Sequence, residues 1–187
     1  MIDFNCDAFN VFRTTLKNTS FDKENSIYMT ELTITVVNFD SFIKDYCSRI
    51  APKSGIAICS ADAAFNISTS DICLVEFKNG AILDSKGRLL DAVKVNIRNK
   101  VNESLLSLID DFNEPLDYFR SSASFVLVFN DSRTKSRNII KSHLGRKSST
   151  PIVLFGLDRY RGFLFKNVYT FTEAEFNSFI TGIFPSS

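Results

Sequence analysis

Two strand-like runs that face each other across a short turn constrain this chain more than any other feature. Residues 60–67 and 72–78 consist mainly of apolar and small residues, and a Ser-Thr-Ser-Asp stretch separates them. The second run is apolar at both odd and even positions until its last residues, and strands of this kind usually lie inside a sheet. The two runs predict an antiparallel β-hairpin at the centre of a sheet.

The length of the turn decides which side chains of this hairpin meet. A three-residue loop pairs Ile67 with Asp71 and places Asp62 opposite Glu76 on one face, with Cβ atoms about 4.5–5.5 Å apart. A two-residue Thr69-Ser70 turn would send Asp62 to the other face, since a slip of one residue reverses every side chain. Thr-Ser is not among the Gly- or Asn-containing pairs that two-residue turns prefer, so the longer loop is favoured.

The favoured register indicates a site for a divalent cation. Glu76 and Lys78 lie on one face because strand side chains alternate. With Asp62, they offer two carboxylates to a hard cation and an amine to a nearby anionic oxygen, as metal-assisted phosphodiester hydrolysis requires. Asp71 is the competing carboxylate, but it abuts the turn and falls on the opposite face from Glu76. In the plainer interpretation, Glu76 and Lys78 form a solvated ion pair that contributes about 0–1 kcal/mol.

The spacing Asp62-x13-Glu76-x-Lys78, followed by a helix with basic residues, resembles the core of the PD-(D/E)XK nuclease superfamily. Three segments extend the resemblance to small bacterial and phage proteins of this type: Ala61–Phe65, Val75–Gly80 and Lys100-x3-Ser104-Leu105. The resemblance spans roughly residues 55–130, and Ala61 stands where the family's name has proline.

The resemblance implies a restriction-endonuclease-like fold, in which helices flank a mixed sheet in the order helix, three antiparallel strands, helix, strand. It also implies that Asp62 and Glu76 ligate Mg²⁺ or Mn²⁺, with the Phe77 carbonyl as a further ligand. Lys78 would orient the attacking water or stabilise the charge that develops on the phosphate.

The remaining patterns predict a mixed α/β fold (α+β in connectivity) with the hairpin in its central sheet. Residues 31–38 alternate as a strand does, although their spacing also allows a helix. Asp40 is expected to cap a helix that runs through Arg49 and ends at Pro52. The later elements are expected to be a helix with the apolar stripe Ile97, Val101, Leu105 and Leu108, strands over residues 124–129, 151–157 and 162–169, and a last helix that a Thr172–Glu175 capping box starts.

Basic residues indicate where nucleic acid would bind. The net charge is only +1, but residues 132–147 contain six Lys or Arg and no acid. Such a segment favours contact with phosphates. The expected nucleic-acid contacts are Arg133, Lys135, Arg137 and Lys141. The alternative is a solvated surface, as charge runs usually are. Lys94 and Arg98, on the predicted central helix, belong to a second basic set with Lys100.

Two further groups of ionisable residues extend the candidate site. Lys100 flanks the apolar stripe of the predicted central helix, so its amine could reach Glu76 and join the catalytic residues. It could equally be an ordinary lysine whose stem packs on apolar surface. Many members of the superfamily carry an acidic residue on the first helix, for which Glu31 and Asp45 are the candidates here.

Composition excludes several classes of function. His143 is the only histidine, so the chain has too few histidines for a His-rich zinc site and only one candidate for a His-based triad. The four cysteines form no C-x-x-C pair, which favours buried free thiols in a reducing compartment over disulfides or zinc. No signal peptide and no apolar run of membrane-spanning length is visible, so we expect one cytoplasmic domain over residues 1–187.

Two hypotheses from different classes follow. The first is a metal-dependent nuclease that cleaves DNA or RNA, and the presence of Asp62, Glu76 and Lys78 together favours it. The second is a non-catalytic binding or regulatory protein of the same fold, which the near-neutral charge favours. That charge would also suit an enzyme whose substrate is delivered by a protein partner or within a homodimer. A third hypothesis, an enzyme acting on another phosphoester, uses the same ions.

Overall fold

The computed structural model describes residues 1–53, 55, 57–84, 88–134 and 153–185. Its centre is a six-stranded mixed sheet with the order β1-β4-β5-β6-β7-β8. The strands pair antiparallel from β1 to β6, and β7 and β8 continue the sheet parallel to β6. The strands are β1 Arg13–Thr15, β4 Thr35–Asn38, β5 Ala63–Asn66, β6 Ile72–Lys78, β7 Ala123–Phe129 and β8 Asn167–Thr172, and a separate hairpin consists of β2 Phe21–Asp22 and β3 Ile27–Tyr28.

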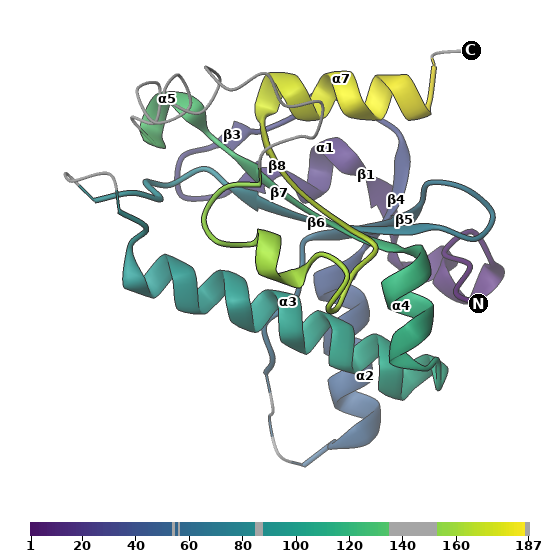
Figure 1. The fold of residues 1–187 in the computed structure, drawn as a ribbon. Helices are drawn as coiled ribbons and strands as arrows, with labels where there is room; N and C mark the ends of the chain where they lie inside the picture. The colour runs from purple at the N-terminus through teal and green to yellow at the C-terminus, as the bar shows by residue number, and fades with distance from the viewer. Residues whose placement is uncertain (54, 56, 85–87, 135–152, 186–187) are drawn as a thin grey trace.

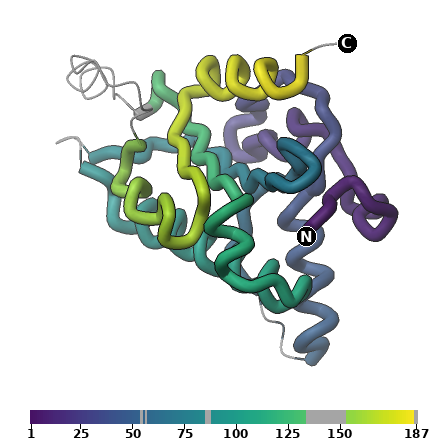
Figure 2. The backbone as a smooth tube through the Cα atoms, turned by 45° about the vertical axis from the view of Figure 1, so that its right-hand side comes forward, coloured from purple at the N-terminus to yellow at the C-terminus, as the bar shows by residue number. Residues whose placement is uncertain are grey.

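Helices cover both faces of the sheet (Figures 1 and 2). On one face lie α2 Phe39–Ile50, α3 Asp91–Phe112 and α4 Leu116–Ser122, and on the other lies α7 Glu173–Ile183. The predicted mixed α/β (α+β) class, with a central mixed sheet and flanking helices, is confirmed. Among the described residues, no helix combines the length and the apolar character needed to cross a membrane. The cysteines are unpaired, and Cys47 and Cys73 are buried.

Two apolar cores separate the sheet from its helices. Ile72 and Leu74 of β6 belong to the core shared with α2, α3 and α4, whereas Val75 and Phe77 belong to the core shared with α7. A strand buried on both faces produces this alternation. Because Glu76 follows Leu74 by two residues, its side chain lies on the face that α3 covers.

The β5–β6 hairpin has the predicted three-residue loop. The N–H of Ile67 donates to the carbonyl of Asp71 at 2.8 Å, and Ala63 pairs with Val75. The ladder ends there, because the N–H of Asp62 donates to the carbonyl of Val75 at 2.9 Å and the chain then turns away. Asp62 therefore lies at the entrance of β5, at the level where the register places Glu76.

The predicted helix cap at Asp40 is wrong. The side chain of Asn38 accepts the N–H of Ser41 at 3.0 Å and caps α2, which begins at Phe39. Asp40 instead lies in the first turn, where an acid still benefits from the positive end of the helix dipole. Of residues 31–38, only the second half forms a strand, β4.

The two strands predicted between residues 151 and 169 need correction. The strand over residues 151–157 is wrong for the part that the structure describes, because Phe155 and Gly156 have φ angles of +61° and +69°. This left-handed region interrupts a strand. The strand over residues 162–169 begins later, at β8, because Gly162, with a φ of +71°, lies in a turn.

The last helix starts where the capping box predicts. The hydroxyl of Thr172 accepts the N–H of Glu175 at 3.3 Å, and the Glu175 carboxylate accepts the N–H of Thr172 at 2.8 Å. From this helix, the ring of Phe176 packs edge-on against Phe77 of β6, with centroids 5.5 Å apart. The cap thus fixes a helix that covers the strand carrying Glu76.

Thr172→Ala should lower the free energy of unfolding by about 1 kcal/mol, because it removes the hydroxyl that caps α7. Thr181→Ala, at an exposed position of the same helix, should change it by less than about 0.5 kcal/mol. Urea unfolding of both variants beside the wild type measures the difference. Equal midpoints for the two variants would contradict the capping role of Thr172.

Candidate functional site

The carboxylates of Asp62 and Glu76 converge on the ammonium of Lys100. Lys100 Nζ lies 3.2 Å from Asp62 Oδ1 and 2.6 Å from Glu76 Oε2. Asp62 precedes β5, Glu76 lies near the end of β6, and Lys100 reaches both from α3. The three charges meet only because the hairpin register and the position of α3 on the sheet are both satisfied.

Hydrogen bonds to the backbone hold Asp62 in this position. Its second carboxylate oxygen accepts the N–H of Phe77 at 2.6 Å, and its carbonyl accepts the N–H of Phe39 at 3.1 Å. The neighbouring N–H of Ala61 donates to the hydroxyl of Ser104 on α3 at 2.9 Å. One oxygen of Asp62 is thereby fixed to the sheet, while the other faces α3.

Burial makes the charged forms of Asp62, Glu76 and Lys100 costly. The side chain of Glu76 is 2% exposed, and those of Asp62 and Lys100 are each 17% exposed. Burial and the adjacent Asp62 raise the pKa of Glu76 well above its ordinary value, against the attraction of Lys100. Burial also raises the pKa of Asp62, which Lys100 and the N–H of Phe77 oppose. Burial lowers the pKa of Lys100, but the two carboxylates outweigh it and the net shift is upward. One ammonium thus faces two acids, and the site favours additional positive charge.

Lys78 and Asp62 open onto one cavity of about 420 Å³ between the end of β6 and the β2–β3 hairpin. Asn79, which follows Lys78, donates from Nδ2 to the Asp22 carboxylate at 2.7 Å. Its Oδ1 accepts from Asn130 Nδ2, also at 2.7 Å. These bonds attach the small hairpin to the ends of β6 and β7, so the hairpin forms one wall of the cavity that Lys78 lines.

Sequence reasoning missed an acid close to this cluster. Asp40 adds to the rise in pKa that burial causes at Asp62, and its carboxylate accepts a hydrogen bond from the hydroxyl of Ser60. The prediction that Asp40 caps the helix left out its effect on the pKa of Asp62. The position of Asp40 in the first turn of α2 was the available signal for this effect. Glu31 and Asp45, the candidates for an acid on the first helix, instead pair with other cations at the surface.

The basic run after β7 is described only at its start. Arg133 is exposed on α5 Asp131–Thr134. Burial raises the pKa of Glu173, at the start of α7, and the charge of Arg133 opposes that rise. The other expected contacts, which lie outside the described residues, are Lys135, Arg137 and Lys141. Their contact with nucleic acid stays a prediction.

The oxygen donors of the cluster fit a hard divalent cation. An oxygen from Asp62 and one from Glu76 lie within 3.2 Å of a single point, the position of Lys100 Nζ, and carboxylates suit Mg²⁺ and Mn²⁺. In the part of the chain that the structure describes, no group of three or more His, Cys, Asp or Glu is arranged to hold a metal ion. The other ligands of an ion would be the Phe77 carbonyl, as the resemblance implies, water and substrate oxygens, since Mg²⁺ usually keeps several waters.

Comparisons with known proteins supply no relative for this arrangement. The chain matches no protein-family model, no curated protein and no solved structure. The chemistry of the site therefore has to be argued from its own residues.

Lys100→Met should lower the free energy of unfolding by about 3 kcal/mol, because it leaves the carboxylates of Asp62 and Glu76 buried without a counter-charge. Adding Glu76→Gln should recover part of the loss, since one of the two unpaired charges is then removed. Lys94→Met, on the same helix and without an ion pair among the described residues, should cost less than about 0.5 kcal/mol. Denaturation in the presence of EDTA measures all three. A Lys100→Met protein as stable as the wild type would show that the cluster contributes nothing to folding.

Proposed function

We propose that this protein is a metal-dependent nuclease that hydrolyses phosphodiester bonds of DNA or RNA with Mg²⁺ or Mn²⁺. One observation carries the proposal: Asp62 and Glu76 converge on a single cationic group beside the cavity that Lys78 lines. Keeping two buried carboxylates together is costly, and perturbed acids of this kind gather at functional sites.

Each residue of the cluster would have its own role. Asp62 and Glu76 would hold the ion, together with the carbonyl of Phe77. A divalent ion held there lowers the pKa of a coordinated water and offsets the charge of the phosphate. Lys78 would orient the attacking water or donate to the oxygen on which negative charge develops. Lys100 would oppose the rise in pKa that burial causes at both carboxylates, because a neighbouring cation favours their deprotonated forms.

The order of the elements supports the proposal. Strands β4, β5 and β6 are antiparallel neighbours, α3 and α4 follow, and β7 returns parallel to β6. This order of strands, helices and final strand is compatible with the restriction-endonuclease-like core that the motif resembles. The difference is that α2 stands between β4 and β5.

A non-catalytic binding or regulatory protein of the same fold is the alternative, and one observation favours it. Lys100 already supplies both carboxylates with a counter-charge at hydrogen-bond distance. A cluster of this kind can be purely structural. The two functions differ in whether a divalent ion can enter between Asp62 and Glu76.

With Mg²⁺ or Mn²⁺, the wild type should cleave labelled DNA or RNA. Glu76→Ala and Lys78→Ala should each reduce the rate by roughly 100-fold or more, because each removes a group that acts on the reacting atoms. Asp71→Asn is the matched control: it changes the competing carboxylate, which pairs with Lys166 at 2.9 Å, and should leave the rate unchanged. Gel assays on single- and double-stranded substrates measure the rates. Loss of cleavage in Asp71→Asn but not in Glu76→Ala would reverse the assignment.

Calorimetric titration with Mg²⁺ tests the ion site separately from cleavage. Glu76→Ala should lose binding, and Asp62→Asn should weaken it without unfolding the protein, because the amide oxygen still accepts the N–H of Phe77. Lys100→Met should bind Mg²⁺ at least as tightly as the wild type, since its ammonium no longer competes for the same position. Mg²⁺ should then also restore stability to that variant. A wild type that binds no Mg²⁺ or Mn²⁺ at millimolar concentration would make the non-catalytic function the better one.

A further inference from the structure

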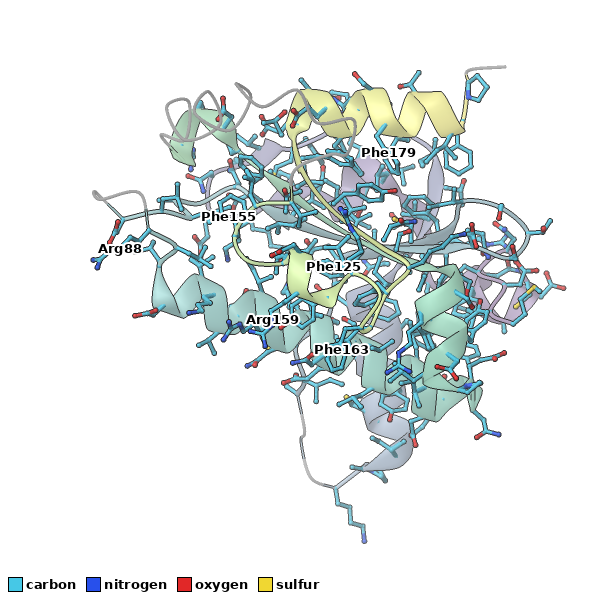
Figure 3. The ribbon with its side chains drawn as sticks, in the orientation of Figure 1. Arg88, Phe125, Phe155, Arg159, Phe163 and Phe179 are labelled. Atoms are coloured by element: carbon cyan, nitrogen blue, oxygen red, sulfur yellow. The ribbon has the colours of Figure 1, made fainter. Side chains whose placement is uncertain are left out.

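A second cleft, of about 630 Å³, lies between the N-terminal half of α3 and the turn that precedes β8. Arg88, Lys94 and Arg98 line it from the helix side. Phe155 lines it from the turn, and Arg159 lines it from the short 3-10 helix η2 (Asp158–Tyr160) that follows the turn. In Figure 3, Phe155 and Arg159 lie on the segment that passes in front of α3, and Arg88 lies near the start of that helix. None of these residues belongs to the cluster around Glu76.

Helical geometry explains how α3 can serve two sites. With 3.6 residues per turn, Lys100 and Arg98 stand about 200° apart around the helix axis. Ile97, between them on the buried side, packs into the core. Lys100 therefore projects from the flank next to Asp62 and β5, whereas Lys94 and Arg98, four residues apart, share the flank next to the turn before β8.

The cleft carries an excess of positive charge, although the net charge of the protein is only +1. Arg88 pairs with Asp84 at 2.9 Å, which leaves Asp91 as the other acid that lines the cleft. The lining cations that form no ion pair within the described residues are Lys94, Arg98 and Arg159. Three cations against one acid make the cleft suited to an anion.

The turn before β8 is held in an unusual conformation. Phe155 has a φ of +61°, which is rare for a bulky side chain, and Gly156 follows with a φ of +69°. The ring of Phe155 packs edge-on against Phe129, the last residue of β7, with centroids 5.2 Å apart. This contact fixes the turn so that Arg159 faces α3. Backbone strain of this kind persists mainly at ligand-binding and active sites.

We propose that this cleft binds the phosphate backbone of a nucleic acid. Guanidinium groups bind phosphate oxygens in pairs of parallel hydrogen bonds, and Arg98 and Arg159 present two such groups from opposite walls. Both clefts are lined by the connection from β6 to α3: Lys78–Gly80 line the cavity beside Asp62, and residues 88–90 line the basic cleft. A nucleic-acid strand that extends from the basic cleft to the other cavity would reach the cluster of Asp62 and Glu76, and this last step rests on the proposed function.

The Arg98→Gln/Arg159→Gln double variant tests the cleft in EDTA, where a cleavage step does not contribute. Fluorescence anisotropy of a labelled oligonucleotide, measured across a salt series, should show binding weakened by roughly tenfold or more. The slope of log K against log salt should become shallower by about 1.4 on single strands or about 1.8 on duplex DNA, the amount expected for two lost phosphate contacts. Lys44→Gln/Lys53→Gln removes the same charge from two exposed positions, one on α2 and one three residues after its end, and should change neither quantity.

Five outcomes are decisive. If the wild type binds and the double variant is unchanged, the cleft assignment is overturned while the proposed nuclease stands. If the double variant loses binding and the wild type cleaves nothing with metal, the cleft assignment holds and the nuclease is overturned. Equal losses in the control, or a wild type that binds no nucleic acid at low salt, overturn the cleft. Competition by polyglutamate as strong as that by unlabelled oligonucleotide would do so as well, in favour of an acidic protein partner.

Discussion

Two carboxylates buried next to each other repel, and the ammonium of Lys100 allows Asp62 and Glu76 to stay together. This interaction requires particular positions of the β5–β6 hairpin and of α3. The β5–β6 loop must contain three residues, because a slip of one residue would turn Asp62 to the other face. The helix α3 must cross β6 at the level of Glu76. Both conditions are met by elements whose own burial is apolar, so the hydrophobic cores align the charges rather than the reverse.

In the proposed function, the cluster that forms an ion pair would also hold a divalent ion without a change in the position of Asp62. One carboxylate oxygen of Asp62 accepts the N–H of Phe77, and its backbone bonds Val75 of β6 and Phe39 at the start of α2, so an ion that replaced the ammonium would find the carboxylate already oriented. Sites supported by a second set of hydrogen bonds keep their geometry when the ligand changes. The bond from Ala61 to Ser104 adds to this support, because it fixes the chain before Asp62 to α3.

Sequence patterns predicted the elements that depend on residues close together in the chain, namely the β5–β6 hairpin, the buried face of α3 and the start of α7. The apolar run of β6 and the poor turn propensity of Thr-Ser were enough to place Asp62 opposite Glu76, and the apolar stripe of α3 left Lys100 within possible reach of Glu76. The start of α7 followed from the capping box alone.

The parts that sequence reasoning placed wrongly depend on competition or on distant contacts. Asn38 and Asp40 are both residue types that cap helices. In the structure Asn38 is the cap, and the charge of Asp40 instead acts on Asp62. The apolar segment before β8 resembles a strand, but Phe155 adopts a turn whose ring packs on Phe129 of β7. The position of Arg159 and Arg98 on one cleft has no local signature, because the two residues are separated by most of the second half of the chain.

The basic cleft that Arg98 and Arg159 line changes what the net charge of the protein implies about its function. A near-neutral chain favours a non-catalytic protein only if charge acts through its sum, yet interactions between exposed charges are screened beyond about 8 Å at physiological ionic strength. Phosphates therefore respond to the cations that surround them, and α3 separates the two signs: its Lys100 flank faces the carboxylates, whereas its Arg98 flank faces a basic cleft. A chain with a net charge of +1 can present both an acidic site for a cation and a basic path for a polyanion, provided that a helix lies between them. The absence of a large positive net charge is thus no argument against a nucleic-acid substrate.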